Sequence, residues 1–135
     1  MIRSVYKWKG FYIGRYETGS GYVVKPNVAP QANVNWYAFY QKQKEMYQAS
    51  SKVMSSMVYG SQWDQVMLWM YNDPATKAYV TDSTGKGNYS GSIANTGVTA
   101  SAKVKNIYDM AGNVYDWTQE VNGSNVRILR RRHIQ

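Results

Sequence analysis

At 135 residues the chain has the length of one ordinary domain, and its 44% hydrophobic and 18% charged residues exclude an intrinsically disordered protein. The absence of cysteine excludes disulfides, cysteine-ligated zinc and thiol nucleophiles within the chain. No stretch approaches the ~20 apolar residues of a membrane span, and the first residues lack the apolar stretch of a signal peptide, so we expect neither. The net charge of +8 comes from Lys and Arg residues that are scattered except near the end, so we do not expect a nucleic-acid partner.

The first predicted element is a strand. Residues 10–17 are aromatic and β-branched, and they run into a Gly- and Ser-rich turn at residues 18–21. Val23 and Val24 are expected to form a short return strand, after which prolines interrupt regular structure.

Two helices are predicted next. The first runs from Trp36 to about Ser50 with Asn35 as its N-cap, and aromatic residues repeat along one face at helical spacing. The second runs from about Ser61 to Tyr71 and ends before Pro74. Residues 61–64 have the shape of a capping box with Asp in place of Glu. We expect the apolar residues of both helices to be core; they are Trp36, Phe39, Tyr40 and Tyr47 in the first helix, and Trp63, Val66, Met67 and Met70 in the second.

A long irregular loop is predicted from Asp73 to Ala102, because this segment is rich in Gly, Ser, Thr and Asn and has little apolar periodicity. Loops of this length in a compact domain usually carry function. Tyrosine with Ser and Asn forms adaptable recognition surfaces. The candidate ligand-binding residues are Tyr79, Asn88, Tyr89 and Ser90, with ordinary loop residues as the alternative.

The most specific motif is Asn-Ile-Tyr-Asp-Met-Ala-Gly-Asn-Val-Tyr-Asp-Trp-Thr at residues 106–118. It resembles the signature of formylglycine-generating-enzyme-like domains, the sulfatase-modifying factor family, and especially bacterial and prophage members. Residues 10–17 resemble the opening strand of that family, and residues 59–64 resemble the start of its second helix. The resemblance spans most of residues 5–130 and implies an α+β, C-type-lectin-like fold with small twisted antiparallel sheets, two helices and long loops.

The resemblance also implies a calcium site. In the family this turn commonly wraps a calcium ion, and the corresponding donors here are the Asp109 side chain, the Gly112 and Val114 carbonyls and the Asp116 carboxylate. Calcium takes six to eight oxygen ligands, which suits such a turn. The alternative is that both Asp residues only cap the turn by accepting backbone N–H groups. Trp117 and Asn113 are expected to be structural, the ring as an anchor for the sheet and the amide as a partner for loop backbone.

Catalysis is not expected. The oxidases of the family use two cysteines to bind copper, and a related branch uses several histidines to hold iron, but this chain has no cysteine and one histidine, His133. We therefore expect no copper. Hydrolysis by a pair of carboxylates, such as Glu17 and Asp64, is an alternative, but nothing in the sequence favours it over the interpretation that these acids are solvated surface charges.

The last residues depart from the family. Arg127–Arg130 matches a family strand, but residues 131–135 stand where two glycines are expected. We interpret residues 1–135 as a single domain that is incomplete at its C-terminus, with a short variant carrying a basic tail as the alternative. Missing strands would leave an exposed edge open to self-association or to a tail-protein partner.

Together these observations predict a non-catalytic, lectin-like domain that binds a glycan or protein receptor. Its expected place is a prophage tail or a bacterial surface-associated protein, with the cytoplasm as the alternative. A fragment of an oxidase-like enzyme and a structural assembly domain are the alternative functions.

Overall fold

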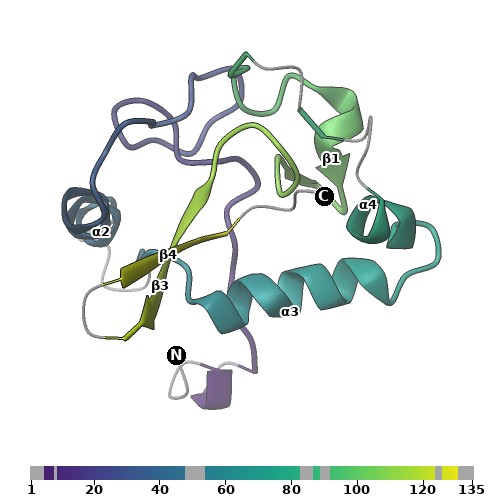
Figure 1. Ribbon diagram of the computed structural model, residues 1–135, viewed down its shortest axis with the longest axis horizontal. Helices are drawn as coiled ribbons and strands as arrows, with labels where there is room; N and C mark the ends of the chain where they lie inside the picture. The colour runs from purple at the N-terminus through teal and green to yellow at the C-terminus, as the bar shows by residue number, and fades with distance from the viewer. Residues whose placement is uncertain are drawn as a thin grey trace.

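The computed structural model describes residues 5–7, 9–47, 54–82, 87–88, 92–123 and 126–130. The fold is α+β, with short helices, two small antiparallel sheets and long connecting loops (Figure 1). The elements are α2 (Trp36–Glu45), α3 (Gly60–Tyr71), α4 (Lys77–Thr81), the 3-10 helix η1 (Ala100–Ala102), β1 (Lys103–Val104), β2 (Ile107–Tyr108), β3 (Asp116–Asn122) and β4 (Val126–Arg130). Among the described residues, no helix is both long and apolar enough to span a bilayer.

Helix α2 begins where the sequence predicts. The Asn35 side chain accepts a backbone N–H of the first turn at 3.0 Å, which is the predicted N-cap. The helix ends at Glu45, before the predicted end near Ser50, and residues 48–50 lie outside the described part of the chain. Its aromatic stripe is only half-buried, and Tyr47 is exposed, so this face is a packing surface rather than the core. Trp36 secures the helix because its Nε1 donates to the Thr118 carbonyl on β3 at 2.7 Å.

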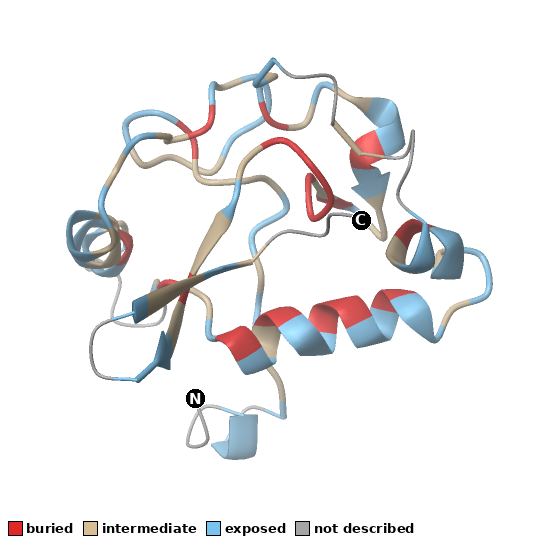
Figure 2. Ribbon diagram, in the orientation of Figure 1, coloured by how far each residue is buried: buried red, intermediate tan, exposed pale blue. Residues whose placement is uncertain are grey.

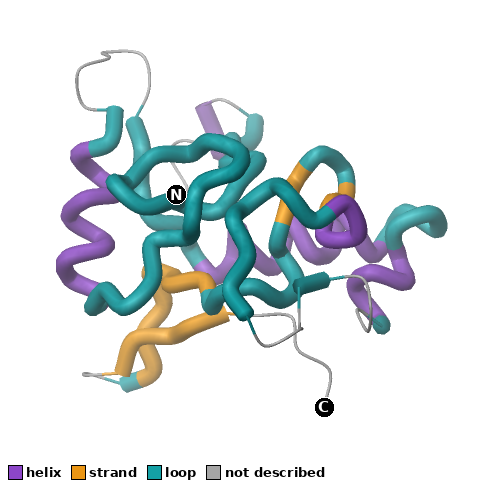
Figure 3. Tube along the Cα trace, turned by 90° about the horizontal axis from the view of Figure 1, so that it is seen from above, coloured by secondary structure: helices purple, strands orange, loops and turns teal. Residues whose placement is uncertain are grey.

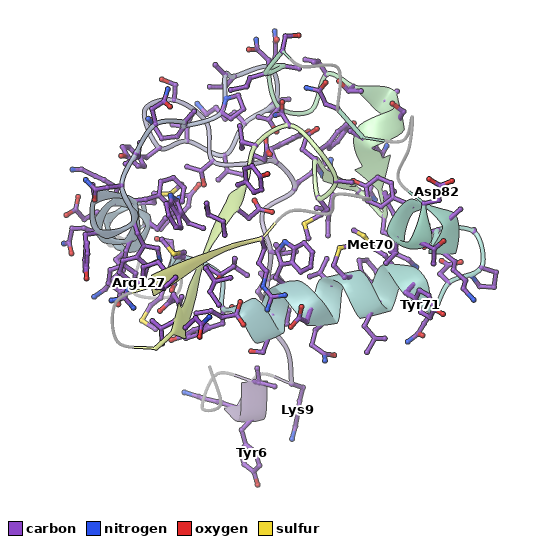
Figure 4. The ribbon with its side chains drawn as sticks, viewed as in Figure 1. Tyr6, Lys9, Met70, Tyr71, Asp82 and Arg127 are labelled. Atoms are coloured by element: carbon purple, nitrogen blue, oxygen red, sulfur yellow. The ribbon has the colours of Figure 1, made fainter. Side chains whose placement is uncertain are left out.

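Helix α3 supplies the centre of the core, as predicted. Its buried stripe faces the rest of the molecule, while the opposite face is exposed (Figure 2). The stripe repeats at helical spacing, which places the rings and thioethers on one side. Its members are Trp63, Val66, Met67 and Met70, and Met70 is fully buried at the position labelled in Figure 4.

The predicted capping box of α3 is wrong by two residues. The helix begins at Gly60 with Tyr59 as its N-cap, and the Tyr59 backbone N–H donates to Gln62 Oε1 at 2.9 Å. Asp64 instead pairs with Arg130 across the surface at 3.0 Å. The acid that resembled a capping residue is therefore used to connect α3 to β4.

The predicted loop from Asp73 to Ala102 is not irregular throughout. It contains α4 and η1, and the Tyr79 ring from α4 enters the hydrophobic core beside α3. Tyr79 is only 3% exposed, and its hydroxyl accepts the Ala111 backbone N–H at 2.8 Å. One buried ring thus organises a segment whose other residues are mostly polar.

The predicted N-terminal strand is also wrong. Residues 10–17 form no strand, and the Arg15 carbonyl accepts from the Tyr108 N–H at 2.9 Å. The turn that follows is present, because Gly19 bridges to Val23, the first residue of the predicted return strand. Gly19 also bridges to Pro30. The segment is therefore held by isolated bridges and not by a ladder.

The two hairpins lie on either side of the turn that follows β2. Strands β1 and β2 pair antiparallel, as do β3 and β4, and the β3–β4 register is irregular between Trp117 and Val121. The predicted strand at Arg127–Arg130 is confirmed as part of β4. Trp117 Nε1 donates to the Val34 carbonyl at 3.2 Å, so the ring anchors β3 as predicted. Seen from above, loops make up most of the trace around these elements (Figure 3).

Candidate functional site

The candidate site is the turn between β2 and β3, residues 109–115. Its first five residues, 109–113, are buried and form the red loop near the centre of Figure 2. Asp109, Gly112 and Asn113 have positive φ values of 64°, 87° and 57°. Gly, Asn and Asp are the residues that adopt this conformation at the lowest energetic cost, so the local sequence suits the turn.

Gly112 is required by its neighbours as well as by its φ. The backbone of Asn88 passes directly over it, and a Cβ atom at Gly112 would lie 2.4 Å from the Asn88 carbonyl oxygen. The two residues form an isolated parallel bridge. The glycine therefore lets a distant loop pack against the turn.

Asn113 is the centre of the hydrogen-bond network. Its Nδ2 donates to Glu17 Oε2 at 2.6 Å and to the Ala94 carbonyl at 3.2 Å. Its Oδ1 accepts from Asn88 Nδ2 at 2.8 Å and from the Ala94 N–H at 3.0 Å. The amide satisfies its donors and acceptor with loop groups, as the sequence analysis expects of this residue.

Asp109 holds a second loop. Its Oδ2 accepts from Thr96 Oγ1 at 3.0 Å and from the Gly97 backbone N–H at 3.2 Å. Thr96 is fully buried, and its hydroxyl also accepts the Glu17 N–H at 3.1 Å. Asp109 therefore caps backbone, as the alternative interpretation states, but in the loop opposite rather than in its own turn.

Asp116 points toward the core side of the turn. Its Oδ2 accepts from Trp63 Nε1 of α3 at 3.1 Å. This bond joins the first residue of β3 to the buried face of α3, so the acid does not cap the turn. The Asp116 carboxylate is thus one end of a connection between turn and core.

Three acids share this region, and its electrostatics oppose their ionisation. Burial, with the neighbouring charge of Asp116, raises the pKa of Glu17 to about 9, although the Asn113 hydrogen bond acts the other way. Burial raises the pKa of Asp116 to about 7 and also raises that of Asp109. Burying a charge without a counter-charge is costly, so the site favours a proton or a bound cation.

One oxygen in the site has no partner. Glu17 Oε1 is buried and makes no hydrogen bond among the described residues, although the Val114 backbone N–H acts to lower the pKa of this carboxyl. Buried polar atoms usually have a hydrogen-bond partner, so this oxygen is a position where a bound cation could supply the missing partner. With its pKa raised to about 9, this carboxyl holds a proton at neutral pH, and a hard cation such as calcium would bind it in place of that proton.

Side chains alone do not form a metal cage. Within the described ranges, no three acid, histidine or cysteine side chains converge closely enough to hold a metal ion. An ion at this turn would need backbone oxygens, and the predicted Gly112 and Val114 carbonyls lie in the turn between Asp109 and the first residue of β3, Asp116. The structure brings Glu17 beside these residues through its bond to Asn113.

The predicted ligand-binding residues do not form one surface. Tyr79 lies in the core, and the partly buried Asn88 packs against Gly112 and Asn113. Tyr89 and Ser90 lie outside the described residues. We therefore leave Tyr79 out of the proposed binding surface.

Sequence reasoning missed Glu17 and Thr96 as members of the site. Glu17 lies 96 residues before its partner Asn113, and no spacing or motif connects the two. The carboxylate alternative paired Glu17 with Asp64, but Glu17 bonds Asn113 while Asp64 bonds Arg130.

Comparisons of the chain with family models, with curated proteins and with solved structures give no match.

Proposed function

We propose that the chain is a non-catalytic binding domain with a C-type-lectin-like fold, and that its loops contact a glycan or protein receptor. The proposed setting is a prophage tail or a bacterial surface-associated protein. The observation that carries the proposal is the 109–115 turn, whose buried residues 109–113 hold the loop at residues 88–97 and the segment at Glu17. The buried polar groups of the turn form hydrogen bonds that hold the loops in position.

Fixed loops favour recognition because less conformational freedom is lost when a ligand binds. Asn113 connects the turn to the loop that contains Asn88 and Ala94 and to the segment at Glu17. These two parts of the chain lie far from each other in sequence. Removing the turn would release both together.

Exposed tyrosines provide contact area for such a ligand. Tyr12 is fully exposed, Tyr37 is 68% exposed and Tyr115, inside the turn itself, is 55% exposed. A tyrosine offers a rigid apolar ring with a polar end, which suits sugars and protein surfaces. Several such rings on a loop-rich domain support binding over a purely internal role.

Calcium is the proposed ion of the turn. The Asp109 side chain, the Gly112 and Val114 carbonyls and Asp116 would hold it, and copper is not expected. When bound, the ion would neutralise the negative charge of the three carboxylates, Glu17, Asp109 and Asp116. The support for this step is the raised pKa values of the acids together with the unpartnered Glu17 oxygen.

A glycan array and a pull-down with intact bacterial cells test the proposal. Purified protein at micromolar concentration is expected to bind at least one glycan or one cell type. Absence of binding in both assays by folded protein would reject the receptor-binding function and leave structural assembly as the better alternative.

A further inference from the structure

Arg127 on β4 has an unusual environment for a surface arginine. Its guanidinium carbon lies 4.2 Å from the ring centre of Trp36 and 5.4 Å from that of Tyr37. One guanidinium nitrogen donates to the Tyr37 hydroxyl at 3.4 Å. Figure 4 shows Arg127 between β4 and α2. Two rings and a hydrogen bond therefore hold the cation in place.

Among the residues described, Arg127 makes no ion pair. Arg130, three residues further along the same strand, provides the contrast. It binds Glu120 at 2.7 Å and Asp64 at 3.0 Å, so acids neutralise it. Arg127 keeps N–H donors for an oxyanion, and a fixed planar guanidinium is a preferred partner of carboxylates and phosphates.

The arginine ends a column of stacked groups along α2. Trp36 stacks on Tyr40 with ring centres 4.9 Å apart and planes 9° apart. Lys44 lies 5.2 Å from the Tyr40 ring centre on the other end, and it too makes no ion pair within the described ranges. Trp36 and Lys44 are eight residues apart, which is about 12 Å along a helix.

We propose that this column, Arg127–Trp36–Tyr40–Lys44 with the adjoining Tyr37, binds an acidic polysaccharide. Two unpaired cations at opposite ends of this column, whose helical members Trp36 and Lys44 are about 12 Å apart along the helix, suit a linear polyanion better than a single small anion. The exposed Tyr37 ring and the tyrosine hydroxyls offer contacts for sugar rings and hydroxyls. The inference rests on the proposed function, because it names the ligand class of a glycan-binding domain and places its contact on α2 and β4.

The stacking pattern favours a polysaccharide over single-stranded nucleic acid. Proteins bind single strands by stacking bases on open aromatic faces. Here Tyr40 stacks on Trp36 and the Arg127 guanidinium lies over the same ring, so Trp36 already has its stacking partners. What remains available is the exposed Tyr37 ring, tyrosine hydroxyls and cationic N–H groups, which match sugar rings, hydroxyls and carboxylates.

Calorimetric titration of the full chain with polygalacturonate tests the inference. Methyl-esterified polygalacturonate has the same backbone with its carboxylates masked, and oligo(dT) is a polyanion without that sugar backbone. The variants are Arg127→Gln, Arg127→Lys and Lys44→Gln. Lys77→Gln is the matched control. Lys77 also lies over a tyrosine ring, that of Tyr71, but it belongs to α4 and not to the proposed binding column.

Wild-type protein is expected to bind polygalacturonate and to bind the esterified polymer and oligo(dT) at least about tenfold more weakly. Arg127→Gln should weaken binding about tenfold, Arg127→Lys less, and Lys77→Gln by no more than about twofold. If circular dichroism shows that Arg127→Gln fails to fold, Lys44→Gln on the exposed helix serves in its place, with an expected loss of about threefold.

Equal effects of Arg127→Gln and Lys77→Gln would overturn the inference, as would equal binding of the esterified polymer or tighter binding of oligo(dT). Failure of the wild type to bind polygalacturonate would overturn it too. Binding to a neutral glycan or to cells in that case would leave the proposed function standing.

Discussion

Replacing Gly112 with alanine tests whether the buried turn holds the distant loop. Alanine at the observed φ of 87° costs about 1–2 kcal/mol, because the left-handed region places Cβ against the backbone. The new Cβ would also lie 2.4 Å from the Asn88 carbonyl oxygen, so the Asn88 backbone must move. That movement weakens two bonds between Asn88 and Asn113, at 2.7 and 2.8 Å, each worth about 1 kcal/mol.

The expected total is a loss of roughly 3 kcal/mol, which corresponds to about 10 °C in melting temperature for a domain of this size. Urea denaturation followed by circular dichroism measures it. Gly21→Ala is the matched control, because Gly21 also has a positive φ of 77° but nothing within 4 Å of its Cβ position. If Gly112→Ala costs no more than Gly21→Ala, the close approach of the Asn88 loop has no energetic role and the reasoning fails.

Three further changes probe the site and its surroundings. Asn113→Asp replaces the buried amide donor with a carboxylate and should cost roughly 2–4 kcal/mol by urea denaturation at pH 7, and a cost below that of an average surface change would contradict the network. Arg130 lowers the pKa of Glu120, so the stability from this pair is present above the ordinary value of 4.5 and is lost as the pH falls through the lowered value in the folded state. Arg130→Gln should therefore destabilise the protein by about 1 kcal/mol at pH 7 and by less at about pH 3, whereas an equal loss at both would argue against the ion pair. Millimolar calcium should raise the melting temperature and chelator should reverse the rise, while Asp109→Asn and Asp116→Asn should reduce the shift, and a wild type without a shift would exclude calcium.

Helix α3 could be predicted because its signals are local, whereas strand β4 is expected from the family resemblance of Arg127–Arg130. The stripe from Trp63 to Met70 repeats at helical spacing, and Pro74 marks where the helix cannot continue. The Asn35 cap is equally local, since the side chain bonds a backbone group three residues later. Such features need no knowledge of distant contacts.

The misplaced elements depend on contacts between distant parts of the chain. Residues 10–17 have strand-like composition, but within the described part of the chain their one backbone–backbone hydrogen bond joins Arg15 to Tyr108, so no ladder forms. Tyr79 is one tyrosine in a polar segment, and its core position follows from the buried partners Ala111 and Ala102. β-propensity and loop composition report local preference, which tertiary packing overrides.

The candidate site also contains some residues that the sequence predicts and others that only the folded chain brings together. The motif identifies the turn, because Gly112 and Asn113 have the residue types that a positive φ requires. It does not identify Glu17 or Thr96, whose roles arise from loops brought together by folding. The raised pKa of Glu17 comes from that burial and has no counterpart in the sequence.

The central claim is that loops fixed by the 109–115 turn bind a surface receptor. Its most direct test is a binding isotherm of folded protein on intact bacterial cells, in calcium and in chelator. Saturable binding at micromolar concentration in calcium, weakened by chelator at a temperature where circular dichroism still reports folded protein, is the predicted result. The absence of saturable binding by folded, calcium-supplemented protein to every cell type and glycan tested would contradict the claim.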